Sequence, residues 1–323
     1  ERKSIGEIVD LFIDSEESGK NISTEIFSIS GRIMAKRGMG KVVFFDLKDQ
    51  TGKIQLHYKD EENDISKEFL DLLDIGDIIG VDGVIFRTRR GEITLDLKKI
   101  VLLTKSIRPL PDKWSGLKDN EIRYRQRYLD LISNDESKEI AIKRSKIVSS
   151  VRNFMNNRGF LEVETPILVD IPAGGRAIPF ETFHNTLDKK LFLRIATELH
   201  LKKLIVGGIE KVYEIGRLFR NEGIDHDHNP EFTTMESYES YEDYNTVMKM
   251  VEDLVSFVAK EVNGTTKIKI SEDKYIDLSP PWDRVDLRET IINNTGIDFL
   301  EFKTSDLLSK IMIEKGYVAD SKE

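Results

Sequence analysis

The sequence feature that most constrains the fold is a pair of strand-like segments joined by a long polar loop. Val212 to Phe219 and Phe232 to Tyr238 are rich in β-branched, apolar and aromatic residues, as strands are. The connection, Asn221 to Pro230, is longer and more charged than a tight hairpin turn, and loops of this length usually bind a ligand. We therefore predict a strand pair that carries a binding loop at one end.

The period of two in a strand places the polar groups of the second segment. Phe232, Thr234, Glu236 and Tyr238 share one face, because alternate residues of a strand point the same way. Arg220 lies where the first strand enters the loop. A guanidinium, a carboxylate, an aromatic ring and a phenol together suit a small zwitterion beside a phosphate-bearing nucleotide. The alternative is an exposed edge hairpin whose charges are only solvated.

Size and composition exclude several classes of protein. With 323 residues the chain is long enough for two domains, and no apolar run approaches the ~20 residues that span a bilayer. The absence of cysteine excludes disulfides and thiolate sites and fits a reducing compartment, so we expect a cytoplasmic protein without a signal peptide or membrane contact. A net charge of -9 means that nucleic-acid binding requires a local basic patch.

The first part of the chain has the pattern of a small β-barrel. Residues 1–21 form a short helix and a linker, and residues 22–105 carry five strand-like runs with a helical pattern between the third and fourth. This order is that of an OB-fold barrel, which binds single-stranded nucleic acid on the face of strands two and three. The residues expected on that face are Lys36, Arg37, Phe44 and Gln55, with Arg87, Arg89 and Arg90 near its rim. The alternative is a barrel used only for packing.

Residues 106–136 form a connector whose arginine-dense run, Arg123 to Arg127, either contacts a nucleic-acid backbone or holds two domains together. A second domain, residues 137–323, begins with a helix over Lys138 to Arg158 that Gly159 stops. The extended segment Phe160 to Pro166 follows. Helix and segment form either a dimer contact or an internal packing surface.

Three smaller features lie in this second domain. Gly174 and Gly175 mark a loop where backbone can approach a ligand closely. Thr197 is a candidate N-cap for a helix with Glu198 in its first turn, where the helix dipole favours a carboxylate in any case. The pair of histidines in His226-x-His228 is a weak candidate for a metal site, since no further ligand spacing accompanies it.

Taken together, these segments resemble the class II lysyl-tRNA synthetase family. GFLEVETP (159–166) is similar to the first motif of that class, and FRNEG (219–223) with HNPEFT (228–233) is similar to the second. The segments that match the lysine family itself are RPLPDK (108–113), RYRQRYLD (123–130), LRIATEL (193–199) and VGGIEKVYEIG (206–216). The likeness runs almost from end to end of the chain.

The resemblance implies an α+β multidomain fold. An OB-fold anticodon-binding barrel at residues 22–105 and an interdomain hinge at 106–136 would precede a class II catalytic domain at 137–323, with an antiparallel sheet and flanking helices. It further implies a lysine–tRNA ligase that uses ATP, Mg²⁺ and L-lysine to form lysyl-adenylate and then acylates tRNA(Lys). A homodimer through Gly159 to Pro166 is also expected.

The resemblance also assigns site residues. Arg220 would be catalytic, because it would hold the α-phosphate of ATP and the lysine carboxylate. The residues implied for ATP are Arg220, Glu222, His228 and Phe232. Those implied for lysine are Gly174, Gly175, Glu198, Arg220, Glu236 and Tyr238, with Glu198 and Tyr238 at the ε-ammonium. Those implied for the anticodon are Arg37, Phe44, Gln55 and Glu92.

The sequence departs from the family pattern in two places. The loop from Ala173 to Phe180 is about one residue shorter than in many relatives. The chain also stops before the third class II motif, so the magnesium ligands and a second ATP arginine are expected beyond Glu323, and this stretch alone is not expected to complete the reaction. Two alternatives stay open: an aspartyl or asparaginyl relative with the same barrel, and a non-enzymatic tRNA-binding or regulatory protein.

Overall fold

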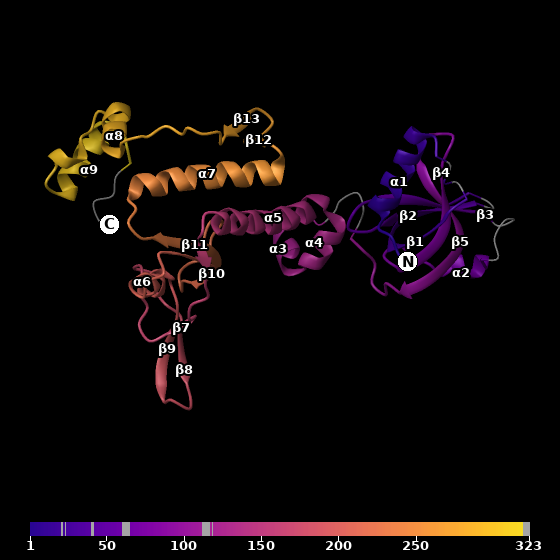
Figure 1. Cartoon of the computed structure of the whole chain (residues 1–323), viewed down its shortest axis with the longest axis horizontal. Coiled ribbons are helices and arrows are strands. Elements are labelled where there is room, and N and C mark those ends of the chain that lie inside the picture. The colour runs from indigo at the N-terminus through magenta and orange to yellow at the C-terminus, as the bar shows by residue number, and fades with distance from the viewer. Residues whose placement is uncertain are drawn as a thin grey trace. The chain divides into compact units, whose positions relative to one another are not determined.

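The computed structural model describes residues 1–20, 22, 24–39, 42–59, 65–111, 117 and 119–318 (Figure 1). Its contacts divide the chain into two units, Glu1–Glu139 and Ile140–Glu323. The part of the connector at 112–116 and 118, including the end of the RPLPDK segment, lies outside the described residues. No helix in the described part of the chain combines the length and apolar character that crossing a membrane requires.

The first unit is built on a closed five-stranded barrel with strand order β1-β2-β3-β5-β4. Its strands are β1 (Ile26–Met39), β2 (Val42–Lys48), β3 (Lys53–Lys59), β4 (Ile78–Arg87) and β5 (Ile93–Thr104). Helix α2 (Lys67–Asp71) lies between β3 and β4 in sequence, so the OB-fold arrangement predicted from the sequence is confirmed. Alternate residues of the strands, such as Phe45, Leu47, Ile54 and Leu56, fill the barrel because each strand turns every second side chain inward.

Helix α1 (Ile5–Ser18) packs against this barrel. Ser4 caps it: the Ser4 hydroxyl accepts from the Glu7 amide, and the Glu7 carboxylate accepts from the Ser4 amide, which satisfies two otherwise free donors. The apolar face of the helix contributes Ile5, Ile8 and Phe12 to the barrel core. Burying that face is what stabilises the short helix, since an isolated helix of this length is marginal in water.

The connector forms two short helices, α3 (Asn120–Arg125) and α4 (Arg127–Ser133), around one buried carboxylate. Asp130 accepts hydrogen bonds from Arg123 Nε at 2.8 Å and from Arg127 Nη1 at 2.5 Å. Arg125 pairs with Glu121 in the same segment. The arginines of this run are therefore engaged inside the connector, which favours a structural role over contact with a nucleic-acid backbone.

The second unit centres on the predicted hairpin. Strands β10 (Lys211–Phe219) and β11 (Glu231–Glu239) pair antiparallel from Lys211 opposite Glu239 to Phe219 opposite Glu231. The short strand β6 (Leu161–Glu162) adds to β10 in parallel. A second small sheet has the order β7-β9-β8, from β7 (Leu168–Val169), β8 (Glu181–His184) and β9 (Lys189–Leu193).

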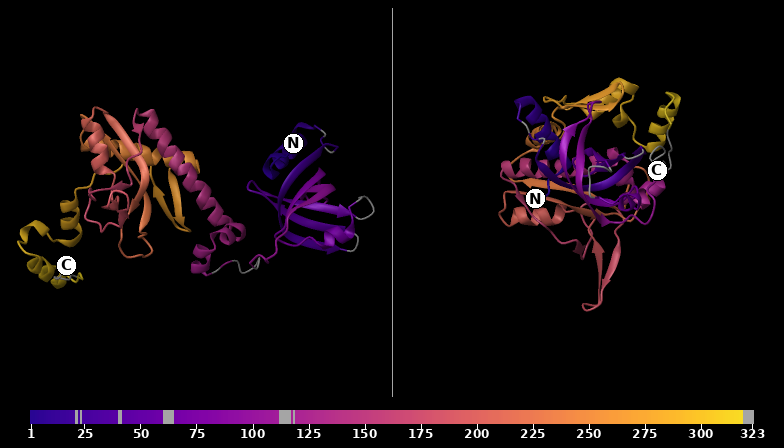
Figure 2. Two further views of the ribbon diagram at one scale, coloured as in Figure 1. Left: turned by 90° about the horizontal axis from the view of Figure 1, so that it is seen from below. Right: turned by 90° about the vertical axis from the view of Figure 1, so that its right-hand side faces the viewer.

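Helices cover both faces of this hairpin. Helix α5 (Asp135–Asn157) and helix α7 (Tyr244–Asn263) bring Met155 and Met250 against Tyr213 of β10 (Figures 1 and 2). Helix α6 (Glu198–Val206) contacts β10 and β11 where Glu236 points, on the face that carries the polar residues. One face of the hairpin therefore packs against apolar side chains of α5 and α7, and the other face holds the polar side chains next to α6.

The remaining elements follow α7. They are β12 (Lys267–Ser271), β13 (Lys274–Asp277), α8 (Leu287–Thr295), the 3-10 turn Phe299–Glu301 and α9 (Ser305–Glu314). The segment after β13 is fixed to α7 by Glu252, whose buried carboxylate accepts from Arg284 Nη2 at 2.7 Å and from the Trp282 amide at 3.3 Å. Fold class is thus α+β, as predicted from the sequence.

Candidate functional site

Two carboxylates and a phenol gather on the polar face of the hairpin. Glu236 Oε1 accepts a hydrogen bond from the Thr197 amide at 3.2 Å, which joins β11 to the start of α6. Burial, the negative charges of Glu236 and Glu198, and a hydrogen bond to Glu236 raise the pKa of Tyr238 to about 12. The phenol therefore stays protonated and can donate. The structure brings together Glu198, Glu236 and Tyr238, as the sequence predicted.

The glycine loop closes onto this cluster. Gly174 has φ of +91°, and a Cβ there would lie 2.6 Å from Ala196 Cβ and 3.3 Å from Glu198 Oε2. Only glycine permits both that backbone conformation and that approach. Gly175 is less restricted, since the nearest atom to its Cβ position is Ile195 Cδ1 at 3.9 Å. Gly174 is therefore placed against the Glu198 carboxylate, a contact that was not predicted from the sequence.

The predicted cap of α6 is wrong in one respect. Thr197 does occupy the N-cap position, but its side chain makes no capping hydrogen bond. Its backbone is in the right-handed helical region instead of the extended region that aims a cap hydroxyl at the first turn. Thr197 Oγ1 is instead buried, next to the amide that binds Glu236, and no described residue forms a hydrogen bond with it.

A buried ion pair that the sequence reasoning missed supports the cluster. Arg194 Nη1 lies 2.6 Å from Glu214 Oε1, and the two side chains are 3% and 4% exposed. Glu214 stands directly opposite Glu236 in the hairpin register, where two carboxylates alone would repel. A Cβ on Gly216 would lie 2.3 Å from Arg194 Nη2, so glycine makes room for the guanidinium. The alternation of β10 could have found Glu214, since it shares the face of Glu236.

Arg220 and Phe232 form the second part of the site. The Arg220 amide donates to Pro230 O at 2.9 Å at the loop end of the hairpin, and the guanidinium carbon lies 5.2 Å from the centroid of the Phe232 ring. Arg220 Nε is buried, and none of the residues that the structure describes offers it a hydrogen-bond acceptor. A buried charged donor without a partner is costly, and an anion bound there would satisfy it. The pair therefore offers an anion site beside an aromatic plane.

The loop of the hairpin carries Glu222 and His228. Glu222 Oε1 accepts from the Ile178 amide at 3.2 Å, and the Asn221 amide donates to Ile178 O at 2.8 Å, so the glycine-loop segment is tied to the hairpin loop. His228 Nδ1 lies 2.8 Å from both carboxylate oxygens of Asp225. That hydrogen bond and the charge of Asp225 raise the pKa of His228 above its ordinary value.

The metal alternative at the two histidines gains no support. His226 is exposed and its Nδ1 lies 3.1 Å from Asp227, whereas His228 faces Asp225. Within the residues that the structure describes, no group of three or more His, Cys, Asp or Glu is suited to hold a metal ion. Each histidine of the described loop faces a different aspartate.

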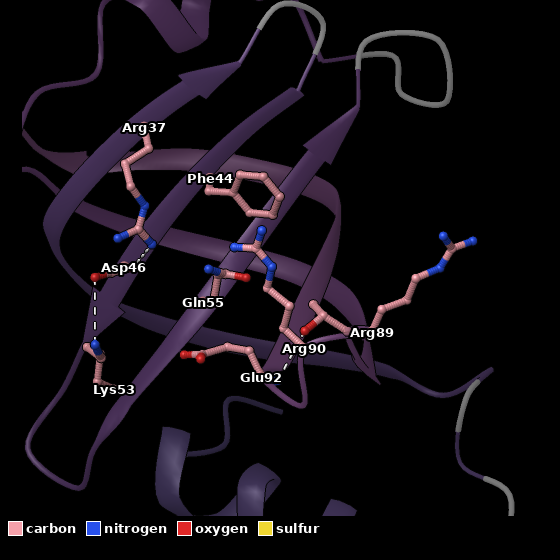
Figure 3. Close-up of a pocket in the computed structure, with 9 residues that line it drawn as sticks. Arg37, Phe44, Asp46, Lys53, Gln55, Arg89, Arg90 and Glu92 are labelled. Atoms are coloured by element: carbon pink, nitrogen blue, oxygen red, sulfur yellow. Dashed lines mark hydrogen bonds and ion pairs between the residues drawn. The ribbon is translucent and has the colours of Figure 1, made fainter.

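A second candidate site is a groove of about 740 Å³ on the barrel (Figure 3). The four residues that the resemblance implied for the anticodon, Arg37, Phe44, Gln55 and Glu92, all line it. Arg37 Nη2 is held 2.6 Å from the buried Asp46 carboxylate, and Gln55 Oε1 accepts from Thr94 Oγ1 at 3.1 Å. The groove thus presents a partly buried ring, an amide and a guanidinium, the last two held in place by neighbours in the sheet.

The arginines near this groove differ in what they can reach. Arg90 extends between Gln55 and Phe44, whereas Arg89 points away from the sheet (Figure 3). Arg87, predicted near the rim of this groove, donates to Glu16 of α1 at 2.9 Å and to Gly91 O at 2.8 Å, so its guanidinium is held by protein groups.

Lys36 does not lie on the groove face, where it was predicted. It neighbours Arg37 in the strand, so it points to the opposite side, and its Nζ donates to Leu70 O and Leu73 O.

One further residue of this face escaped the sequence reasoning. His57 stands opposite Phe44 in the β2–β3 register, with ring centroids 5.3 Å apart, and its Nδ1 lies 2.8 Å from Asp96 Oδ1. Its position two residues after Gln55 places it on the same face, so the period of the strand would have found it.

Comparison with known proteins identifies both units. Residues 119–313 match the family described as tRNA synthetases class II (D, K and N), and residues 27–103 match the OB-fold nucleic acid binding domain. A lysine–tRNA ligase of Thermoanaerobacter pseudethanolicus is 50% identical over 98% of this chain and 63% of its own length. Lysine–tRNA ligases of Pelotomaculum thermopropionicum and Staphylococcus aureus are 53% and 50% identical over 89% and 90% of the chain, and over 57% and 58% of their own lengths. The chain spans about three fifths of the length of these curated relatives.

Proposed function

The chain belongs to the class II tRNA synthetases (D, K and N), and from that premise we propose that it is a lysine–tRNA ligase. It would activate L-lysine with ATP to lysyl-adenylate and pyrophosphate, and then transfer the lysyl group to the 3′ end of tRNA(Lys). The single observation that carries this proposal is the cluster of Glu198, Glu236 and Tyr238 at the hairpin that carries Arg220, whose buried Nε has no hydrogen-bond partner among the described residues.

The carboxylates select the amino acid. Glu236 and the backbone of the loop at Gly174 and Gly175 would take the α-ammonium of lysine, and Glu198 with Tyr238 would take the ε-ammonium. A neutral competitor would leave a desolvated carboxylate unpaired, which rejects it strongly. An acidic side chain would meet two like charges. This favours lysine over aspartate and asparagine.

The nucleotide would lie across Arg220 and Phe232. The Arg220 guanidinium stacks on one face of the Phe232 ring, and the other face would take adenine. Arg220 would satisfy its free Nε–H on the α-phosphate or on the lysine carboxylate. Glu222 would hydrogen-bond near adenine, and His228, held in a more basic state by Asp225, would reach the outer phosphates.

The chemistry needs no protein nucleophile. An oxygen of the lysine carboxylate attacks the α-phosphorus in line, and pyrophosphate leaves; a terminal ribose hydroxyl of tRNA then attacks the carbonyl, and AMP leaves. Arg220 would hold the attacking carboxylate near the phosphorus and stabilise the charge that develops on its oxygens. Mg²⁺ would supply further positive charge to the phosphates; the described residues include no group of three or more His, Cys, Asp or Glu suited to hold a metal ion.

The barrel would read the anticodon. Phe44 would stack on a base, Gln55 would hydrogen-bond a base edge, and Arg37 and Glu92 would support them. Specific reading through a small groove fits a chain with a net charge of -9, which lacks the general basic surface of a non-specific binder.

Dimerisation is part of the same proposal. Phe160 is buried, but Leu161 and the α5 residues Ile140 and Ile147 are exposed apolar side chains. A second copy that covered them would remove this apolar surface from water. A monomer at micromolar concentration in light scattering would contradict this element. We further propose a cytoplasmic location and the domain limits 22–105, 106–136 and 137–323.

The test is exchange of labelled pyrophosphate into ATP by the full-length protein, with lysine, aspartate or asparagine as the only amino acid. We expect exchange with lysine alone. Exchange with aspartate or asparagine in its place would overturn the lysine assignment. Tight tRNA binding without exchange with any of the three would indicate a non-enzymatic tRNA-binding protein.

A further inference from the structure

An ammonium group of the protein itself sits at the carboxylate proposed for the substrate's side chain. Lys202, one turn after Glu198 on α6, forms an ion pair with Glu198 Oε1. The same Lys202 Nζ lies 5.6 Å from the centroid of the Tyr238 ring, within cation–π range. Glu198 and Tyr238 are the two groups proposed to hold the ε-ammonium of lysine. Lys202 therefore occupies that position with the same chemical group.

The two carboxylates of the cluster are too few to pair with the two ammonium groups of a bound lysine and with that of Lys202. Free lysine brings an α-ammonium and an ε-ammonium, and the pocket provides the carboxylates of Glu198 and Glu236. Each substrate ammonium would pair with one carboxylate. Lys202 would then be a third cation next to the ε-ammonium, where like charges repel. Either Lys202 or the substrate must leave Glu198.

Lys202 is the group that can leave at low cost. Its side chain is 54% exposed and that of Glu198 is 37% exposed, so water reaches the pair and can solvate a released ammonium. The flexible four-carbon stem lets the ammonium swing away without moving the helix. Half-exposed ion pairs are weak, so a bound substrate can replace this one.

We propose that Lys202 is a resident counter-ion of the amino-acid site, which the ε-ammonium of the substrate displaces from Glu198 and Tyr238. Lys202 neutralises Glu198 while the site is empty and competes with lysine for it. It thereby weakens the apparent affinity for lysine. This inference rests on the proposed function, because the displacing group is the side chain of lysine.

The test compares Lys202→Met with the wild-type full-length protein in lysine-dependent pyrophosphate exchange. Methionine keeps an apolar stem against Tyr238 and removes the charge. The KM for lysine is expected to fall about two- to fivefold, which is the equilibrium equivalent of an exposed ion pair, with the KM for ATP unchanged. Binding of lysine alone by calorimetry is expected to tighten by the same factor.

Lys203→Met is the matched control. Lys203 is the next residue of α6, it is exposed, and it has no ion pair within the part of the chain that the structure describes. It is expected to leave both KM values unchanged, so a general effect of removing one positive charge from α6 is separated from an effect at Glu198. Thermal unfolding of both variants checks that each is folded.

Two results would overturn the inference while the proposed function stands. An unchanged KM for lysine in Lys202→Met would mean that Lys202 does not compete, and a raised KM would mean that it instead holds Glu198 in position. Exchange with aspartate or asparagine in place of lysine by the wild-type protein would overturn the proposed function itself.

Discussion

The barrel groove and the hairpin site differ in how their polar groups are held. The groove residues Arg37, Phe44 and Gln55 come from adjacent antiparallel strands of one continuous barrel. The hairpin site instead draws Gly174 and Glu198 from segments far from β11 in the sequence. Strand register therefore positions these three groove residues, whereas the hairpin site depends on tertiary packing between separate segments.

The ion pairs of the two sites also differ in their exposure to water. In the groove the buried Asp46 pairs with Arg37, whose side chain is half exposed, so water screens the interaction. Under the hairpin site both Arg194 and Glu214 are buried. A change on the barrel face should thus alter binding with little effect on stability, and a change under the hairpin should alter stability first.

The largest expected effect is on the buried pair. Glu214→Gln leaves the Arg194 guanidinium buried without a counter-charge, which costs about 3–5 kcal/mol in the free energy of unfolding. The loss should appear in the urea unfolding transition of the second unit and leave that of the barrel unchanged. The matched control is Glu231→Gln on the same hairpin, whose partner Arg217 is exposed; it is expected to change little. If Glu214→Gln and Glu231→Gln lowered the free energy of unfolding equally, the stated difference between buried and exposed pairs would be contradicted.

Next in size is the effect of Arg220 on catalysis. Arg220→Ala removes the group proposed to stabilise charge at the α-phosphate, and lysine-dependent pyrophosphate exchange should fall about 100- to 1000-fold. Binding of an anticodon stem-loop RNA to the same variant should be unchanged. Loss of RNA binding in step with exchange would mean that the two sites are not independent.

A change in the groove should have a smaller effect, and it should weaken RNA binding while leaving pyrophosphate exchange intact. Phe44→Ala removes one stacking surface and should weaken binding of the anticodon stem-loop by about 1–3 kcal/mol, as for one base on one ring. Pyrophosphate exchange, which needs no tRNA, should keep its wild-type rate. Unchanged RNA affinity would contradict the assignment of this face.

The smallest expected effect is a shift in pH dependence. The hydrogen bond and charge of Asp225 raise the pKa of His228, so the imidazolium persists to higher pH than an unpaired histidine would. If the imidazolium binds the outer phosphates, the KM for ATP rises as pH increases through that pKa. In Asp225→Asn the rise should begin at lower pH. Asp227→Asn, which removes a weaker influence, should shift it less.

The features that the sequence predicts are those set by strand register, and the features that it misses are those set by tertiary packing. Strand periodicity predicted the five strands, the hairpin and the groove residues, because register and alternation are local properties. Lys36 was predicted on the same face as Arg37, but neighbouring strand residues point to opposite sides, and that prediction was wrong. Arg194 and Lys202 were missed because their partners lie across a packing contact and around a helix turn, which no strand pattern encodes.

The residue roles came from family resemblance and not from periodicity. Glu198 alone is explained by the dipole of α6, and Gly174 alone by a flexible loop. In the structure Gly174, Glu198 and Tyr238 lie together, and the proposed function rests on that arrangement.

The central claim is that Glu198 binds the side-chain ammonium of lysine, and Glu198→Gln tests it most directly. The amide keeps the shape of the side chain but lacks the charge, so the hydrogen bond to the ammonium loses about 1.5–3 kcal/mol. In pyrophosphate exchange by the full-length Glu198→Gln protein, we expect a KM for lysine raised at least tenfold and a KM for ATP near the wild-type value. Equal increases in both KM values, or no increase in that for lysine, would contradict it.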